Sequence, residues 1–241
     1  MNQINLIILP GWGGSEETWR DFVGVVGRNF DNARVIELPC FGANPCPTEV
    51  WGVDGYAEYA KKEINKLGYD GKTILLGHSF GGQVAVSLAA KEDGIADALI
   101  LSGAAAIRPK NSIKRMFFLL IAKAGKVLFR LPFIEKFSVL ARKVLYGLAG
   151  SRDYENTTGI KKEIFKKIVR EDSRNLLPKI KIPTLVLWGE KDKYVPLKYG
   201  KKIHKLIPGS AMYIVKDGGH GLHIKNIKEI ELIINEFISH V

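Results

Sequence analysis

Six short aliphatic runs alternate along this chain with segments of helical periodicity, and this alternation limits the possible folds more than any other feature. Each run is four to seven residues long, which is typical of a strand and too short for a buried helix. Consecutive Ile, Leu and Val residues favour strands that are covered on both faces. We predict strands at 4–10, 33–38, 73–77, 98–102, 184–188 and 212–215, and helices at 16–26, 56–67, 81–91, 198–206 and 227–238.

This order of elements predicts an α/β fold with a mostly parallel six-stranded sheet and helices on both faces. Right-handed crossovers bring the carboxyl ends of all parallel strands to one edge of the sheet. Ligands in such folds bind in the loops just beyond that edge. We therefore expect the functional residues in the loops that follow strands.

The positive charge of the chain is concentrated in one internal block. The net charge is +11, and residues 108–178 contain 17 Lys and Arg against 6 Asp and Glu, so the remaining chain is neutral overall. This shift in composition is the strongest boundary signal in the sequence. It predicts a core formed by 1–107 and 179–241, with an inserted helical cap at 108–178 whose apolar clusters alternate with Lys and Arg.

A serine lies where the third expected strand turns into a helix. The sequence Gly77-His78-Ser79-Phe80-Gly81 has the pattern Gly-x-Ser-x-Gly, with an aliphatic run before it and a run rich in Ala, Val and Leu after it. A sharp strand-to-helix turn places such a serine at its apex, and the small residues let neighbouring backbone come close. The alternative is a glycine-rich turn with an idle serine, which the strand–turn–helix context disfavours.

These residues resemble the nucleophile turn of the α/β-hydrolase superfamily, and the resemblance extends over essentially the whole chain, with the basic block as the lid. In that family the catalytic residues follow the order Ser, acid, His. The resemblance implies Ser79 as nucleophile, Asp192 as the acid and His220 as the base. Asp192 lies in the segment 188–196, which follows a strand, and His220 lies in Asp-Gly-Gly-His-Gly after the last strand.

The choice of acid and base has competitors nearby in the sequence. His223 is three residues past His220, and we prefer His220 because two glycines precede it and allow a close approach to the serine. Glu190 and Asp217 are the alternative acids. Asp217 is expected to hydrogen-bond nearby backbone in its loop, and the place of the acid in the resembling family favours Asp192 over both.

The resemblance also implies an oxyanion hole made of two backbone amides. One is the amide of Phe80, the residue after the nucleophile, and the other is that of Trp12 in the loop after the first strand. Gly11 and Trp12 are expected to contact the substrate, with the Trp12 ring as a wall of the acyl pocket. Trp12 could equally be a packing aromatic, and the two roles are compatible. Pro10 stands where many relatives have His.

Together these residues predict a serine hydrolase that cleaves carboxylic esters through an acyl-enzyme and needs no cofactor and no metal. A carbon–carbon bond hydrolase of the same fold is the main enzymatic alternative. A ligand-binding protein that retains a hydrolase fold without catalysis is the alternative from another class.

The basic cap has two interpretations. A solvated lysine-rich surface is the simpler one, and an acidic partner or an anionic substrate is the other. The Gly-Trp-Gly loop and the basic cap are similar to those of the carboxylesterases of biotin synthesis, which act on an acyl carrier ester. No nucleic-acid motif is recognisable. A small-molecule ester is therefore the expected ligand.

Two further expectations concern cysteines and location. Cys40 and Cys46 are the only cysteines, which excludes a disulfide scaffold, and we expect both to be free thiols. They offer too few ligands for a metal site. The N-terminal residues lack a basic targeting region, and lysines interrupt the most apolar stretch of the cap. A cytoplasmic location without a membrane span is the expectation.

Overall fold

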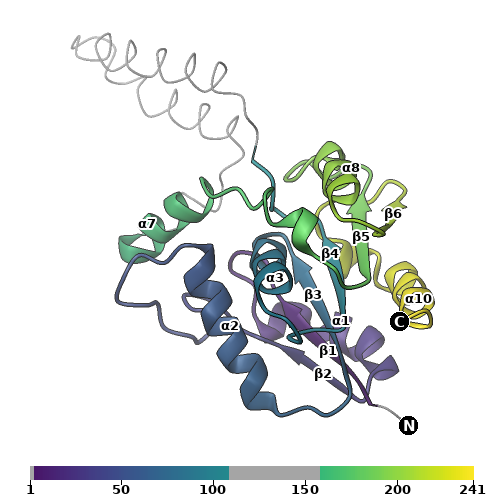
Figure 1. The fold of residues 1–241 in the computed structure, drawn as a ribbon. Helices are drawn as coiled ribbons and strands as arrows, with labels where there is room; N and C mark the ends of the chain where they lie inside the picture. The colour runs from purple at the N-terminus through teal and green to yellow at the C-terminus, as the bar shows by residue number, and fades with distance from the viewer. Residues whose placement is uncertain (1–2, 109–157) are drawn as a thin grey trace. The chain divides into compact units, whose positions relative to one another are not determined.

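The computed structural model describes residues 3–108 and 158–241, and Figure 1 shows how their elements are arranged. Residues 109–157, which make up most of the expected cap, lie outside the described part of the chain. The residues Met1–Arg108 and Gly159–Val241 form one compact unit. Residues 159–178, which the sequence assigned to the cap, thus group with the core, and the cap's boundaries stay a prediction.

A six-stranded sheet lies at the centre of this unit, in the order β2-β1-β3-β4-β5-β6, and every neighbouring pair of strands is parallel. The predicted sheet is therefore confirmed. Its strands are β1 (Ile4–Leu9), β2 (Asn32–Val35), β3 (Lys72–His78), β4 (Ala98–Ser102), β5 (Thr184–Gly189) and β6 (Ala211–Val215).

Helices cover both faces of the sheet (Figure 1). Their bounds are α1 (Glu16–Val26), α2 (Val53–Leu67), α3 (Phe80–Lys91), α7 (Gly159–Ile168), α8 (Leu197–Leu206), α9 (Leu222–Lys225) and α10 (Ile227–Ile238), with short 3₁₀ turns at Gly27–Asn29 and Leu177–Lys179. Strands β1, β3 and β4 are almost completely buried. This explains why their sequences are continuous aliphatic runs rather than alternating patterns.

The two faces of the sheet form two separate hydrophobic cores. One core packs Trp19, Phe22 and Val26 of α1 and three isoleucines of α10 against Leu6, Ile8 and their neighbours on adjoining strands. The other core packs α2, α3, α7 and α8 against the opposite side chains of the same strands. Successive residues of one strand therefore point to different cores, and both helical layers hold the strand ends in place.

No helix of residues 3–108 and 158–241 is both long and apolar enough to cross a membrane. The expected cytoplasmic location stays a prediction.

Candidate active site

Ser79 occupies a strained turn between β3 and α3. Its φ of 52° and ψ of −113° lie outside the regions that L-residues normally adopt. The surrounding backbone holds this conformation: the Ser79 amide donates to the Ser102 carbonyl at 3.1 Å, and the Ser79 carbonyl accepts from Ala105 at 2.8 Å. Such strain persists only where neighbouring contacts over-determine it, and it is typical of reactive sites.

The two glycines of the motif are required by close packing. A Cβ on Gly77 would lie 2.7 Å from both the Ala85 side chain and the Gly82 backbone. A Cβ on Gly81 would collide with the carbonyl oxygens of Leu9 and Pro10 at the end of β1. The start of α3 is therefore pressed against the loop that follows β1, as the pattern Gly-x-Ser-x-Gly predicts.

Asp192 and His220 form a hydrogen-bonded pair at the ends of β5 and β6. The His220 Nδ1 lies 2.7 Å from the Asp192 Oδ2, and the Asp192 side chain is completely buried. The other carboxylate oxygen, Oδ1, accepts from the amides of Tyr194 and Val195 at 2.8 Å each. Because the carboxylate faces Nδ1 as an acceptor, Nδ1 carries the hydrogen and Nε2 keeps its lone pair to take up a proton.

The carboxyl end of β4 connects this pair to the serine turn. Gly103 has a φ of 55°, and a Cβ there would lie 3.1 Å from the His220 Nδ1 and 3.3 Å from the Asp192 Oδ2. Ser102, just before Gly103, and Ala105, two residues after it, hydrogen-bond to the Ser79 backbone. Within residues 3–108 and 158–241 no hydrogen bond joins the Ser79 hydroxyl to His220; the connection between them runs through the backbone bonds of Ser102 and Ala105 and the close packing at Gly103.

The competing acids and the competing histidine lie in other surroundings. Asp217 and Glu190 are exposed; Asp217 pairs with Lys191, and the Glu190 carboxylate accepts from the Asp217 amide. His223 is buried and stacks on Trp19 with ring centroids 4.0 Å apart. Burial, and to a smaller extent His220, lower the pKa of His223 to about 4.

The proposed oxyanion residues contact each other through their side chains. The rings of Trp12 and Phe80 meet edge to face with centroids 5.8 Å apart, and Trp12 also contacts Phe41 and Phe165 at 4.9 Å each. Phe80 is the first residue of α3, where a backbone N–H has no partner inside the helix. A Cβ on Gly11 would lie 3.2 Å from the Ser79 Cβ, so the Gly11 backbone touches the serine turn directly.

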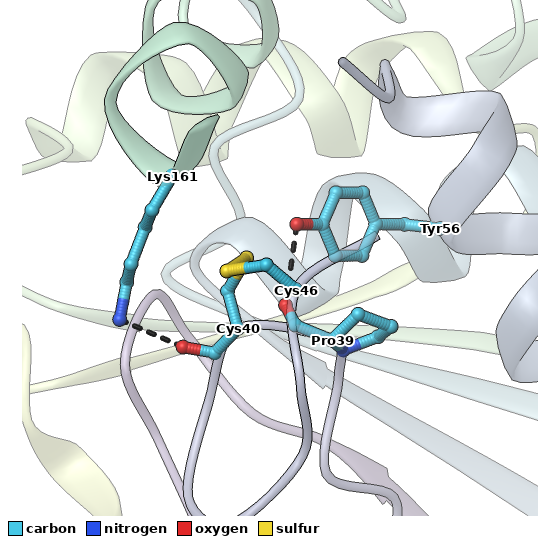
Figure 2. The surroundings of a disulfide bond; sticks show 5 residues. All are labelled: Pro39, Cys40, Cys46, Tyr56 and Lys161. Carbon is cyan, nitrogen blue, oxygen red and sulfur yellow. Dashed lines mark hydrogen bonds between the residues drawn. A yellow bond between two sulfur atoms is a disulfide. The ribbon is translucent and has the colours of Figure 1, made fainter. Parts of the chain in front are cut away.

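Cys40 and Cys46 form a disulfide, so the prediction of free thiols is wrong (Figure 2). The loop turns back at Gly42, where φ is 55°, and the Cys40 amide donates to the Asn44 carbonyl at 3.1 Å. This turn brings the two Cα atoms to 4.2 Å. Cys40 itself has a φ of 76°. That value lies in the left-handed region, which glycine adopts most easily.

The carbonyls beside this disulfide anchor the loop to two helices. The Tyr56 hydroxyl of α2 donates to the Pro39 carbonyl at 3.2 Å, and Lys161 of α7 donates to the Cys40 carbonyl at 2.7 Å (Figure 2). The next residue, Phe41, carries one of the rings that contact Trp12. The disulfide loop therefore supports the aromatic wall beside the serine turn.

Sequence reasoning missed two ring contacts of His220. The exposed ring of Tyr194 stacks on it with centroids 5.2 Å apart, and the buried ring of His78 lies 4.7 Å from it. The position of His78 inside the Gly-x-Ser-x-Gly motif, next to the serine, is a signal that could have indicated the contact with His220. Among the described residues no group of three His, Cys, Asp or Glu side chains could hold a metal ion.

Comparisons with known proteins identify the family of this chain. Human "Serine hydrolase BPHL" is 27% identical over 248 residues, covering 97% of this chain and 79% of that protein. The "2-hydroxy-6-oxo-6-(2'-aminophenyl)hexa-2,4-dienoic acid hydrolase" of Metapseudomonas resinovorans is 23% identical, covering 97% and 83%. The solved esterase EaEST from Exiguobacterium antarcticum superposes with a TM-score of 0.71 at 20% identity, covering 99% and 93%. The model of the alpha/beta hydrolase family matches residues 6–230, and the chain belongs to that family.

Proposed function

We propose that this protein is a serine hydrolase that cleaves carboxylic esters, with Ser79, His220 and Asp192 as its catalytic residues. The observation that carries the proposal is the 2.7 Å bond from His220 Nδ1 to a completely buried Asp192, at the strand edge where Ser79 sits on a strained turn. A serine hydroxyl is a weak nucleophile, and it needs a base whose tautomer and orientation are fixed by a third group.

In the proposed reaction, the Ser79 Oγ attacks the ester carbonyl carbon while the His220 Nε2 takes the hydroxyl proton. The backbone amides of Trp12 and Phe80 stabilise the negative charge that forms on the carbonyl oxygen. The tetrahedral species then collapses, and His220 gives its proton to the departing alcohol. A water molecule, deprotonated by His220, attacks the acyl-enzyme and releases the carboxylic acid and free Ser79.

Substrate preference is proposed to follow from the groups beside the serine turn. The partly exposed rings of Trp12 and Phe165, with Trp12 packed on the buried rings of Phe41 and Phe80, supply an apolar surface for the acyl chain. The ammonium of Lys161 lies 5.9 Å from the Trp12 ring centroid and 5.2 Å from that of Phe41. Together with the basic composition of 108–178, this favours an ester that carries negative charge.

The first experiment measures hydrolysis of p-nitrophenyl acetate and butyrate by the wild type and by Ser79→Ala. Loss of turnover in Ser79→Ala, with full activity in the exposed control Ser239→Ala, is the expected result. A fluorophosphonate probe should label the wild type and the control but not Ser79→Ala. A wild type that hydrolyses no ester and takes up no probe would favour a non-catalytic binding protein.

The carbon–carbon bond hydrolase is the second candidate, because the Metapseudomonas relative has that kind of substrate in its name. A vinylogous 1,5-diketone, followed by loss of its visible absorbance, separates the two. Faster Ser79-dependent cleavage of the diketone than of the esters would replace the ester proposal.

The charge preference is tested with a carboxylate-bearing ester, such as p-nitrophenyl hemisuccinate, against the neutral acetate. The kcat/KM for the hemisuccinate, divided by that for the acetate, should fall as the salt concentration is raised, because salt screens exposed charges. Lys161→Gln should lower the same ratio, and Lys179→Gln, an exposed lysine of the core, should leave it unchanged. A ratio independent of salt would overturn the preference for anionic esters.

A further inference from the structure

His78 packs against two parts of the proposed site, the base His220 and the loop after β1. Its ring centroid is 4.7 Å from that of His220, with 44° between the planes. The His78 Cδ2 also occupies the space next to Gly11, where a Cβ would be only 3.1 Å away. One imidazole thus touches both the proposed base and the loop proposed to carry an oxyanion donor.

The backbone of β4 fixes the orientation of this ring. The His78 Nδ1 lies 3.0 Å from the Ser102 carbonyl, which can only accept, so Nδ1 carries the hydrogen. His78 is 5% exposed. Burial lowers the pKa of His78 well below its ordinary value, and His223 and His220 lower it further. The ring that faces His220 is therefore neutral and does not repel an imidazolium there.

Two further rings pack against His78. His223 lies against His78 with centroids 4.6 Å apart, and Trp19 of α1 stacks on His223 at 4.0 Å. Trp19 also contacts His78 edge to face at 5.9 Å and is 1% exposed. Because rigid, buried rings pack against His78, the imidazole has little room to move.

We propose that His78 is a positioning residue, whose ring fixes the plane of the His220 imidazole and the place of the Gly11 backbone at the same time. This inference rests on the proposed function. It assigns no chemical step to His78, which acts through His220 and through the loop. A displacement of about 1 Å in such a base can lower the rate on the order of 100-fold.

Two substitutions separate the ring contact from the hydrogen bond. His78→Asn keeps a donor that can reach the Ser102 carbonyl but removes the ring next to His220. His78→Phe keeps a ring and loses the bond. The Ser102 carbonyl still accepts from the Ser79 amide at 3.1 Å, so His78→Phe leaves no unpaired oxygen there. His204→Asn, a histidine of α8 that bonds to Ser210, is the matched control.

The expected result is a kcat on p-nitrophenyl butyrate lowered about 30- to 100-fold in His78→Asn, with KM changed less than about threefold. His78→Phe should recover most of that loss, and the control should match the wild type. Thermal unfolding of each variant shows whether it is folded. Full kcat in His78→Asn, or a larger loss in His78→Phe than in His78→Asn, would overturn the inference.

A measurement without substrate distinguishes this inference from the proposed function. The proton between His220 Nδ1 and Asp192 should give a far-downfield NMR signal, assigned by its loss in Asp192→Asn. His78→Asn should broaden or shift that signal, and His78→Phe should restore it. If the wild type hydrolyses no ester, the proposed function fails while this signal still tests His78. If esters are hydrolysed through Ser79 and the signal is unchanged in His78→Asn, only the inference fails.

Discussion

The ring of His223 lies parallel to the ring of Trp19, with 4.0 Å between centroids and 6° between planes. Trp19 belongs to α1, and His223 belongs to the short helix α9 after the last strand. This stacked pair joins the first helix of the fold to the short helix after the last strand, next to His78. It also buries an imidazole whose Nδ1 has no hydrogen-bond partner among the described residues.

The first prediction concerns stability in acid. The pKa of His223 is about 4 in the folded protein and near 6.5 when unfolded. The unfolded state therefore binds more protons between these values, and the stability contributed by His223 is lost as pH falls from 6.5 to 4. His223→Phe keeps the stacked ring. The substitution should therefore abolish a decrease in the free energy of unfolding on the order of 3 kcal/mol between pH 6.5 and pH 4.

Urea unfolding at pH 7 and pH 4.5 checks this prediction. At pH 7, His223→Phe should be as stable as the wild type or more so, because a buried unpaired nitrogen is removed. At pH 4.5 it should be the more stable of the two, while exposed His240→Phe should follow the wild type. Part of the acid sensitivity should persist in His223→Phe, because His78 is also buried with a lowered pKa. Identical pH dependence in His223→Phe and wild type would contradict the assignment.

A second prediction compares two glycines in helices. Gly81→Ala places a methyl group against the Leu9 and Pro10 carbonyls, so it should displace the oxyanion loop, lower stability by about 1–3 kcal/mol and abolish ester hydrolysis. Gly24→Ala in α1 has open space around the new Cβ and should stabilise the protein by about 0.5–1 kcal/mol. Thermal unfolding and butyrate turnover of both variants test the contrast. An active Gly81→Ala would show that the loop does not depend on this contact.

The sequence was most informative where a local pattern decides the structure. The predicted bounds of α1, β4 and α10 agree with the structure residue for residue, because turn or polar residues flank a periodic or apolar run. The four-residue helix α9 was missed, since one turn is too short to show periodicity.

Contacts between segments that are distant in the sequence were harder to predict. The Cys40–Cys46 disulfide depends on how the chain turns at Gly42, which no count of cysteines reveals. The ring contact between His78 and His223 joins β3 to α9, and it exists only once the sheet is formed. In the sequence alone, residues such as His78 and His223 can be recognised only as polar side chains without an assigned role.

A third prediction concerns the disulfide. Closing a loop of this size stabilises a protein by about 2 kcal/mol in the chain-entropy model, so Cys46→Ala should lose about that much. Cys40→Gly also breaks the bond but relieves the positive φ of 76°, and it should be about 1 kcal/mol more stable than Cys40→Ala. Urea unfolding with and without dithiothreitol checks both values. Dithiothreitol should destabilise the wild type and leave all three variants unchanged.

The same loop should influence the acyl pocket. Phe41 follows Cys40 and contacts Trp12, so breaking the disulfide loosens part of the aromatic wall. We expect KM for p-nitrophenyl butyrate to rise more than KM for the acetate, with kcat nearly constant, because a longer acyl chain uses more of the wall. Equal changes for both esters would indicate a general loss of folding instead, and thiol counting confirms that the bond is broken.

The last prediction exchanges one atom in the Asp192–His220 pair. In Asp192→Asn the amide oxygen can still accept from the Tyr194 and Val195 amides, which fixes the orientation of the side chain. The amide nitrogen then faces the His220 Nδ1 as a donor. This arrangement forces the imidazole hydrogen onto Nε2, the atom that must accept the serine proton. We expect kcat to fall about 10⁴-fold with stability nearly preserved, the size of effect known for such an exchange in serine proteases.

Asp217→Asn is the matched control, since Asp217 is exposed, bonds to Lys191 and lies in the loop just before His220. It should retain full activity. Raising the pH should partly restore Asp192→Asn, because hydroxide can take over as base when the imidazole cannot. A decrease in kcat of less than about tenfold in Asp192→Asn would mean that His220 adopts the reactive tautomer without this carboxylate. A comparable loss of kcat in Asp217→Asn would mean that the catalytic acid has been assigned to the wrong loop.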